Sequence, residues 1–403
     1  MRETSRESDA RQAAGCTRRE FLASSALAGA GLAAAVPSLG LGQQTTARST
    51  RRDPYIGYVS LRRDNQIAIF TMDPDTGALT WRERVPLAGG PDPLVLDPRN
   101  RFLYAGCRDR QKLDSFRIDP GTGALSPIGE VPLQGEPIQV ITDRTGRFLL
   151  GAYFYQSTIG VHAVDDAGAI AFPPVEWRYT AYGAHGVEID ASNRFVFVPH
   201  VARSGGPNAV AQLRFDASTG RLTPNAEAFL YLRGNQGPRH IICHPTLNVA
   251  YSSDEQGCSA TAYRIDPETG VLVDFQTIPT VPGYEPRSEI TCSAVQVSPD
   301  GKFLFVTTRE HDSITSFAID QTSGELTYIG GVPTEPNARP LCVDPEGRFL
   351  IAAGSGPFRP RTTPDRDRVV TYQIDQANGQ LSPLEVYEGG TGPMWIVMTT
   401  LSG

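Results

Sequence analysis

The chain has 403 residues, of which 40% are hydrophobic and 20% charged, and its formal net charge is −7. This composition supports a folded core rather than a disordered chain, and the body of the chain has no basic run of the kind that binds nucleic acid. Beyond the first forty residues no apolar run approaches the ~20 residues that span a bilayer, so no membrane insertion of the mature chain is expected.

The first 35 residues are predicted to be an export signal. Arg18 and Arg19 stand directly before an apolar stretch, 21–36, which carries no charge, and an Ala-Ala-Ala sequence at 33–35 offers a cleavage site. This segment resembles a twin-arginine signal, which exports proteins already folded; an amphipathic first helix is the alternative, but the stretch has no polar face. The sequence therefore predicts a periplasmic or extracellular protein, with a linker over 36–54 and one domain over 55–400.

A tight turn of the form Asp-x-x-Thr-Gly-x-Leu recurs along that domain at intervals of 45 to 55 residues, with Ser or Asn in place of Thr in two copies and a degenerate Asp-Asp-Ala-Gly copy at 165–168. Its glycines are Gly77, Gly123, Gly168, Gly220, Gly270, Gly324 and Gly379. Aspartate and threonine side chains bond nearby backbone amides in such turns, and glycine supplies the positive φ. The repetition indicates seven structural units.

A second turn lies between successive copies of the first, with Asp-x-x-Gly/Asn-Arg/Lys-Phe as its pattern. It begins at Asp97, Asp143, Asp190, Ser298 and Asp344, and in a weaker copy at His244. Each unit therefore holds four short strands, here called A, B, C and D in chain order. Four antiparallel strands in about 45–55 residues are typical of a β-propeller blade.

The two ends of the domain are incomplete in complementary ways. The N-terminal unit begins at strand B, over 56–60, and segment 394–399 is a strand A with no B after it. Pairing of these two strands would complete one blade and leave no open sheet edge. The sequence thus predicts an all-β, single seven-bladed propeller closed by its C-terminal strand; a row of β-sandwiches would not explain the complementary ends.

Two columns of the repeat are predicted to ring one mouth of the central channel, because strand A starts and strand B ends at the same face. The start-of-A column contains Asp92, Ile138, His185, Arg239, Ser293, Arg339 and Met394. The end-of-B column contains Arg62, Arg108, Phe154, Val201, Glu255, Arg309 and Ser355. The simplest interpretation of these columns is that their charged side chains are solvated at the rim of the channel and have no functional role.

Four members of the columns favour a functional interpretation. His185, Arg239, Glu255 and Arg309 belong to three consecutive units, so they can converge on one ligand. Guanidinium groups suit a carboxylate or a developing oxyanion, and a histidine beside a glutamate supplies acid–base capacity near neutral pH. The sequence shows neither a G-x-S-x-G elbow nor H-E-x-x-H metal spacing.

Two motifs make a family resemblance specific. Gly237-Pro-Arg-His…His244-Pro and Arg309-Glu-His-Asp-Ser-Ile resemble motifs of the lactonase family of seven-bladed propellers, which includes 6-phosphogluconolactonases and the carboxymuconate lactonizing enzyme. The resemblance implies that His185, Arg239, Glu255 and Arg309 are the catalytic residues. Where the family has a His-x-His pair, this chain keeps only His185, a departure that bears on the substrate more than on the site.

These observations predict a secreted lactone hydrolase that acts on a small anionic, sugar-derived or carboxylated lactone without a metal or cofactor. The expected substrate-binding residues are Arg62, Arg108, His200 and Arg339. Lactonisation, the reverse reaction, and a non-catalytic binding propeller of the cell envelope stay open as alternatives, as does the oligomeric state.

The remaining histidines and the cysteines are expected to be structural. His240 and His244 flank a strand and should make structural hydrogen bonds, and His162 should lie on a strand C away from the channel. The cysteines of the domain are expected to be buried small hydrophobes, with one disulfide left open among Cys107, Cys243, Cys258, Cys292 and Cys342. Two longer loops, 202–208 and 354–368, should open toward the mouth.

Overall fold

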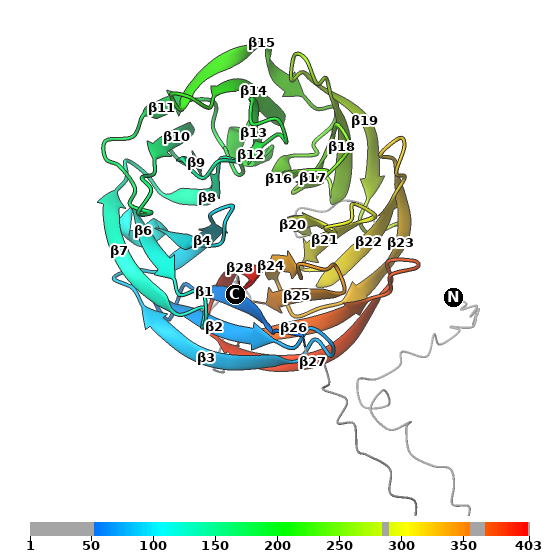
Figure 1. The fold of residues 1–403 in the computed structure, drawn as a ribbon. Helices are drawn as coiled ribbons and strands as arrows, with labels where there is room; N and C mark the ends of the chain where they lie inside the picture. The colour runs from blue at the N-terminus through cyan, green and yellow to red at the C-terminus, as the bar shows by residue number, and fades with distance from the viewer. Residues whose placement is uncertain (1–51, 284–289, 355–366, 402–403) are drawn as a thin grey trace, which may run out of the picture. The chain divides into compact units, whose positions relative to one another are not determined.

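The computed structural model describes residues 52–283, 290–354 and 367–401, and the predicted signal lies outside them. The described residues form seven four-stranded antiparallel sheets, which are arranged as blades around a central channel (Figure 1). Helical structure in these ranges is limited to single 3-10 turns at Arg108–Arg110 and Arg203–Gly205, neither long enough to cross a bilayer. The predicted all-β seven-bladed propeller is confirmed.

The strands follow the predicted order of four per blade. Blade 1 contains β1 (Tyr55–Leu61), β2 (Gln66–Met72), β3 (Leu79–Pro86) and β28 (Pro393–Thr400). Blade 2 contains β4 (Pro91–Leu96), β5 (Phe102–Cys107), β6 (Lys112–Ile118) and β7 (Leu125–Pro132). Blade 3 contains β8 (Pro137–Thr142), β9 (Phe148–Tyr153), β10 (Thr158–Ala163) and β11 (Glu176–Tyr179). Blade 4 contains β12 (Glu188–Ile189), β13 (Phe195–His200), β14 (Ala209–Asp216) and β15 (Arg221–Tyr231).

The same order continues through the second half of the ring. Blade 5 contains β16 (Pro238–Cys243), β17 (Val249–Asp254), β18 (Ser259–Ile265) and β19 (Leu272–Pro279). Blade 6 contains β20 (Thr291–Val297), β21 (Phe303–Arg309), β22 (Ser313–Ile319) and β23 (Leu326–Pro333). Blade 7 contains β24 (Ala338–Val343), β25 (Phe349–Gly354), β26 (Asp367–Ile374) and β27 (Leu381–Gly390). Strand A of each blade is innermost, beside the channel (Figure 1).

The two recurring turns lock neighbouring blades together. The glycine of each of these turns has a positive φ and packs against the start of strand B in the preceding blade, at its first residue or, for Gly123, at its second, Ile56. A Cβ atom on Gly270 would lie 2.2 Å from Phe195, and one on Gly379 would lie 2.4 Å from Phe303. Glycine is therefore required at these turns for its conformation and for the close approach of the phenylalanine ring.

The ring closes through the C-terminal strand, as predicted. β28 pairs antiparallel with β1, from Tyr55 opposite Thr400 to Leu61 opposite Pro393. Across the same junction, Gly77 of blade 1 meets Phe349 of blade 7, which repeats the contact made between other neighbouring blades. The apolar core is divided accordingly, with clusters that lie between adjacent sheets.

The cysteines of the domain are free thiols. Cys107, Cys258, Cys292 and Cys342 are buried, and Cys243 is half-buried. The thiol of Cys258 donates to the backbone oxygen of Ile290 at 3.2 Å, and Cys292 contacts the Thr280 hydroxyl at 3.4 Å. These cysteines therefore fill the core as small, weakly polar side chains.

Candidate active site

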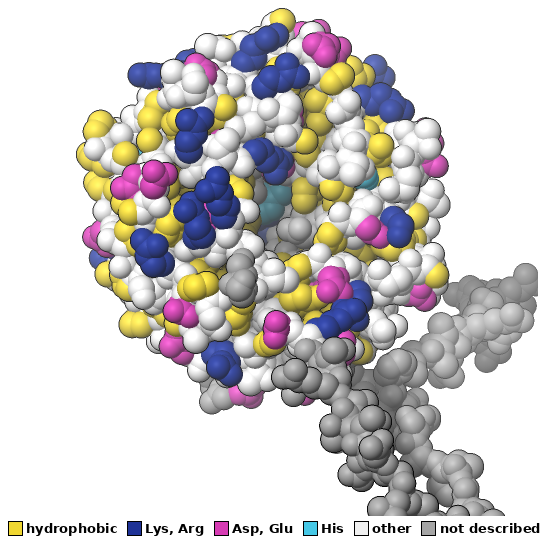
Figure 2. All heavy atoms as spheres, viewed as in Figure 1, with side chains coloured by type: hydrophobic (Ala, Val, Ile, Leu, Met, Phe, Trp, Pro, Cys, Tyr) yellow, Lys and Arg dark blue, Asp and Glu magenta, His cyan; other side chains and the backbone are white. Residues whose placement is uncertain are grey.

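A cavity of about 650 Å³ occupies one mouth of the channel. On this face the molecule is hollowed at its centre, with Lys and Arg side chains gathered around the hollow and histidine visible inside it (Figure 2). Most positions of the two predicted columns line the cavity: Arg62, Asp92, Arg108, Ile138, Phe154, His185, Arg239, Arg309, Arg339 and Met394. The antiparallel order of strands A and B thus brings together residues that are far apart in the sequence.

Arg239, on β16, is a buried guanidinium without an ion pair among the described residues. Its side chain is largely enclosed, the residue being only 6% exposed. Nη1 donates to the backbone oxygen of Ser293 at 3.1 Å and contacts His240 Nε2 at 3.1 Å, while Nε has no partner in the part of the chain that the structure describes. Burial and the nearby Arg309 lower the pKa of Arg239 well below its usual range. Because arginine stays protonated in proteins, this charge is best stabilised by an anion in the cavity.

Arg309, the last residue of β21, is held by a buried carboxylate. Its Nη2 donates to Glu255 Oε1 at 2.7 Å and to the backbone oxygen of Cys292 at 3.2 Å. Glu255 Oε2 lies 3.1 Å from Nε of Arg203, whose loop (202–208) does open onto the cavity as expected. Although burial opposes ionisation, Arg309, Arg239 and Arg203 together lower the pKa of Glu255. Glu255 therefore lies behind the cavity wall and orients two arginines that line it.

His185 stands in a row of aromatic and imidazole rings. Its ring centroid lies 5.7 Å from that of Phe154 and 5.5 Å from that of His240. Nδ1 is buried without a hydrogen-bond partner among the described residues. Burial and then the charge of Arg239 lower the pKa of His185 well below 6.5, so the imidazole is neutral at physiological pH and can accept a proton.

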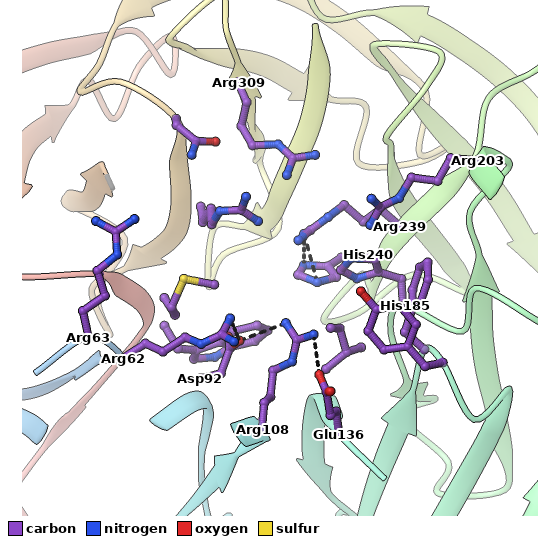
Figure 3. A pocket seen from close by; sticks show the side chains of 18 residues that line it. Arg62, Arg63, Asp92, Arg108, Glu136, His185, Arg203, Arg239, His240 and Arg309 are labelled. Atoms are coloured by element: carbon purple, nitrogen blue, oxygen red, sulfur yellow. Dashed lines mark hydrogen bonds and ion pairs between the residues drawn. The ribbon is translucent and has the colours of Figure 1, made fainter. Parts of the chain in front are cut away.

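The opposite side of the cavity carries a chain of ion pairs from blades 1 to 3. Asp92 Oδ2 lies 3.4 Å from Nη1 of Arg62 and 3.2 Å from Nη1 of Arg108. Arg108 Nη2 lies 3.0 Å from Oε2 of Glu136. In Figure 3 this chain faces Arg239, His240 and Arg309 across the cavity.

The floor of the cavity divides the channel. His240, Arg339 and Trp395 line both the main cavity and a smaller one, of about 140 Å³, further along the channel. The rings of His240 and Trp395 meet with centroids 5.5 Å apart, although they come from blades 5 and 1. Burial and the charge of Arg309 lower the pKa of Arg339 to about 9. His240 was expected to make structural hydrogen bonds, and its Nε2 does contact Nη1 of Arg239 at 3.1 Å, but the ring also lines the cavity.

Not every predicted residue reaches the cavity. His200 is fully buried and its Nε2 contacts the Thr180 hydroxyl at 3.0 Å, so it is not among the lining residues. Val201 lies in the core beside it, and Ser293 contributes only the backbone oxygen that Arg239 binds. Ser355 lies outside the described residues.

The outlying histidines match their expected positions. His244 Nε2 contacts the backbone oxygen of Gly301 at 2.9 Å, and its Nδ1 accepts from the backbone of Leu247 at 2.9 Å. His162 lies on β10, a strand C, with Nδ1 3.0 Å from the backbone oxygen of Ala171. Both rings therefore lie outside the cavity, where they form hydrogen bonds with backbone groups.

Several lining residues lie outside the two predicted columns. They are Arg63, Glu136, Tyr155, Arg203, His240, Asn337, Gly392 and Trp395. Each is one or two positions from a column residue, as Arg63 is from Arg62 and Trp395 from Met394. A wider window around the two columns would therefore have found them. In the described ranges, no group of three His, Cys, Asp or Glu side chains is placed to hold a metal ion.

Comparison with known proteins agrees with this geometry. The family model described as lactonase, 7-bladed beta-propeller, matches residues 53–398. The chain belongs to this lactonase family. A 6-phosphogluconolactonase of Pectobacterium carotovorum is 30% identical over 345 residues, which cover 85% of this chain and 98% of that protein. A 6-phosphogluconolactonase of Yersinia enterocolitica is also 30% identical, over 84% of this chain and 96% of its own.

A solved structure shows the same fold. The periplasmic gluconolactonase of Pseudomonas aeruginosa superposes with a TM-score of 0.75 and 22% identity, covering 87% of this lactonase-family chain and all of its own. The curated relatives are lactone hydrolases by name. The chain is thus a lactonase-type propeller with a strongly cationic cavity at one mouth of its channel.

Proposed function

We propose that this chain hydrolyses a small sugar-derived lactone, with His185 activating water and with Arg239 and Arg309 stabilising the oxyanion. The observation that carries the proposal is Arg239, a buried cation that has no carboxylate partner among the described residues and faces the cavity beside a neutral imidazole. Donors fixed in advance where negative charge develops are the largest single contribution to many acyl-transfer reactions. The curated relatives named 6-phosphogluconolactonase support the same class of reaction.

The proposed reaction begins with proton transfer to His185. As the water oxygen attacks the lactone carbonyl carbon, the imidazole accepts a proton from the water, and the carbonyl oxygen becomes an oxyanion. Negative charge beside His185 opposes the effect of Arg239, so it raises the proton affinity of the imidazole as the transition state forms. The ring C–O bond then breaks, and the imidazolium returns its proton to the leaving oxygen, which gives the open hydroxy acid.

Glu255 has a positioning role in this proposal. It lies behind the cavity wall and holds Arg309 at 2.7 Å, so that the guanidinium presents its remaining donors to the cavity. Because the Glu255 carboxylate is compensated by Arg309 and Arg203, it does not serve as the base. Two imidazoles line the cavity, His185 and His240. His240 contacts Nη1 of Arg239 at 3.1 Å, whereas Nδ1 of His185 has no hydrogen-bond partner among the described residues, so the base is assigned to His185.

We also propose that the enzyme is exported, from the twin arginines at Arg18 and Arg19 and the apolar stretch that follows them. An exported enzyme would not meet cytosolic sugar phosphates. The proposed physiological substrate is therefore an unphosphorylated aldonolactone rather than 6-phosphogluconolactone.

Turnover of lactones by the purified protein tests the proposal. We expect hydrolysis of δ-gluconolactone, measured as acid release, and a loss of about 10²–10³-fold in kcat for Arg239→Ala. Arg264→Gln is the matched control, because Arg264 lies in the same blade but outside the cavity and bonds the backbone oxygen of Ser323. Hydrolysis unaffected by Arg239→Ala would contradict the proposed site, and binding without turnover of any lactone would favour a binding propeller instead.

A further inference from the structure

The wall that faces Arg239 alternates in charge along its length. Arg62 follows β1, Asp92 lies on β4, Arg108 follows β5 and Glu136 precedes β8, and all four line the cavity. Two cations and two anions make this wall neutral as a whole. Its ion pairs, at 3.0 to 3.4 Å, join three blades.

The arginines of this wall differ from Arg239 because their charges are already compensated. Although burial opposes the charged form, Asp92 and Glu136 raise the pKa of Arg108. By contrast, burial and Arg309 lower the pKa of Arg239. Arg62 and Arg108 therefore do not need an anionic ligand. The columns of the repeat had led us to expect that they bind an anionic substrate.

The wall nevertheless keeps hydrogen-bonding groups for a ligand. Both guanidinium groups of the wall bind Oδ2 of Asp92, so these two ion pairs do not use its Oδ1, and Asp92 lines the cavity. The side chains of Arg62 and Glu136 are 37% and 33% exposed, so each keeps a face toward solvent in the cavity. Acceptors and donors thus alternate along one side of the pocket (Figure 3).

We propose that the chain Arg62–Asp92–Arg108–Glu136 is a hydroxyl-recognition subsite, which selects polyhydroxylated substrates for the hydrolysis proposed above. A hydroxyl group both donates and accepts, so neighbouring hydroxyls match a row of carboxylates and guanidinium groups. A wall of compensated ion pairs suits such a neutral, polar partner better than it suits an anion. Sites built to bond a hydroxyl also reject the analogue that lacks it, because their own polar groups are then left unpaired.

Binding of two acids isolates this subsite from catalysis. Gluconate and hexanoate carry the same carboxylate on a six-carbon chain and differ in their hydroxyl groups. By titration calorimetry we expect the wild-type protein to bind gluconate at least about 30-fold more tightly than hexanoate. Asp92→Asn and Glu136→Gln should each lower the preference for gluconate over hexanoate by about 10- to 100-fold. The ratio is the readout because a guanidinium that loses its carboxylate attracts the carboxylate of both acids alike.

The control and the turnover assay separate the two proposals. Glu130→Gln removes another acidic ion-pair partner from blade 2, on β7 and outside the cavity, and should leave the preference for gluconate unchanged. Equal binding of the two acids by the wild type, or an equal loss of both in Asp92→Asn, would overturn the subsite. If the wild type prefers gluconate but does not hydrolyse δ-gluconolactone, the subsite is supported and only the proposed hydrolysis is contradicted.

Discussion

At the scale of single residues, two buried charges, one lining the cavity and one behind its wall, have opposite effects on the stability of the fold. Arg239 is buried without an ion pair among the described residues, whereas Glu255 is bound by two arginines. An uncompensated buried charge opposes folding, and removal of one partner from a buried pair creates such a charge. A substitution of Arg239 should therefore impair function without lowering stability, whereas a substitution of Glu255 should lower stability.

The first prediction compares Arg239→Met with Glu255→Gln in the ligand-free protein. Arg239→Met should leave the free energy of unfolding unchanged or raise it, because an apolar side chain of similar length replaces an unpaired charge. Glu255→Gln should lower it by about 3 kcal/mol, because Arg309 and Arg203 lose their anion. Denaturant titration measures both, and equal destabilisation of the two variants would contradict this account of the site.

A second prediction concerns the pH dependence of stability at His200. Burial lowers the pKa of His200 from 6.5 to about 4. Between these values the unfolded chain binds a proton that the folded chain does not, so the stability that the neutral ring contributes is present above pH 6.5 and lost as the pH falls. Between pH 7 and 4.5 this residue should account for a loss of about 2–3 kcal/mol.

His200→Asn provides the comparison for that loss. The variant should be less stable at pH 7, because a smaller side chain leaves space in the core, but its stability should fall less steeply on acidification. Unfolding curves of both proteins at several pH values measure the difference in slope. Parallel pH profiles would show that His200 does not carry the effect.

At the scale of structural elements, the contact between a turn glycine and the preceding blade holds the ring together. Gly270 has a φ of +73° and its missing Cβ would lie 2.2 Å from the ring of Phe195. Gly270→Ala should therefore lower the free energy of unfolding by several kcal/mol, roughly 3, through backbone strain and overpacking. Gly330→Ala on β23 is the control, since a Cβ there meets nothing within 4 Å and should change stability by less than about 1 kcal/mol.

At the scale of the whole molecule, β28 closes the ring and also supplies Met394 and Trp395 to the cavity. Deletion from residue 393 onward would expose the edge of β1 and remove part of the floor. We expect the truncated protein to aggregate and to lose ligand binding, as measured by size-exclusion chromatography and calorimetry. A soluble truncation with the melting behaviour of the full chain would contradict closure by this strand.

The proposed export depends on the whole chain and is tested separately. Replacement of Arg18 and Arg19 by lysine keeps the charge but removes the guanidinium pair that a twin-arginine pathway reads. The variant should stay in the cytoplasm while its folded domain keeps its activity. Cell fractionation and a lactone assay on each fraction measure this, and normal export of the variant would indicate the general secretory route.

Local pattern and repetition were enough to predict the architecture of this protein. Each Thr-Gly turn bends the chain through its own residues, and seven repeats with complementary ends allow only a closed ring of blades. Because the start of strand A and the end of strand B must meet at one face, the columns also located His185, Arg239 and Arg309 at the mouth. These inferences depend on geometry that every repeat shares.

Only the tertiary structure decided what each of these residues does. Glu255 lies behind the wall rather than on it, His200 turns into the core, and His240 meets Trp395 across the channel. Carboxylates compensate the charges of Arg62 and Arg108, whereas among the described residues none compensates the charge of Arg239. This difference depends on contacts between residues that are distant in sequence. The repeat places a residue at the mouth, but its charge state and role depend on burial and on partners brought by closure of the ring, which a one-dimensional pattern does not contain.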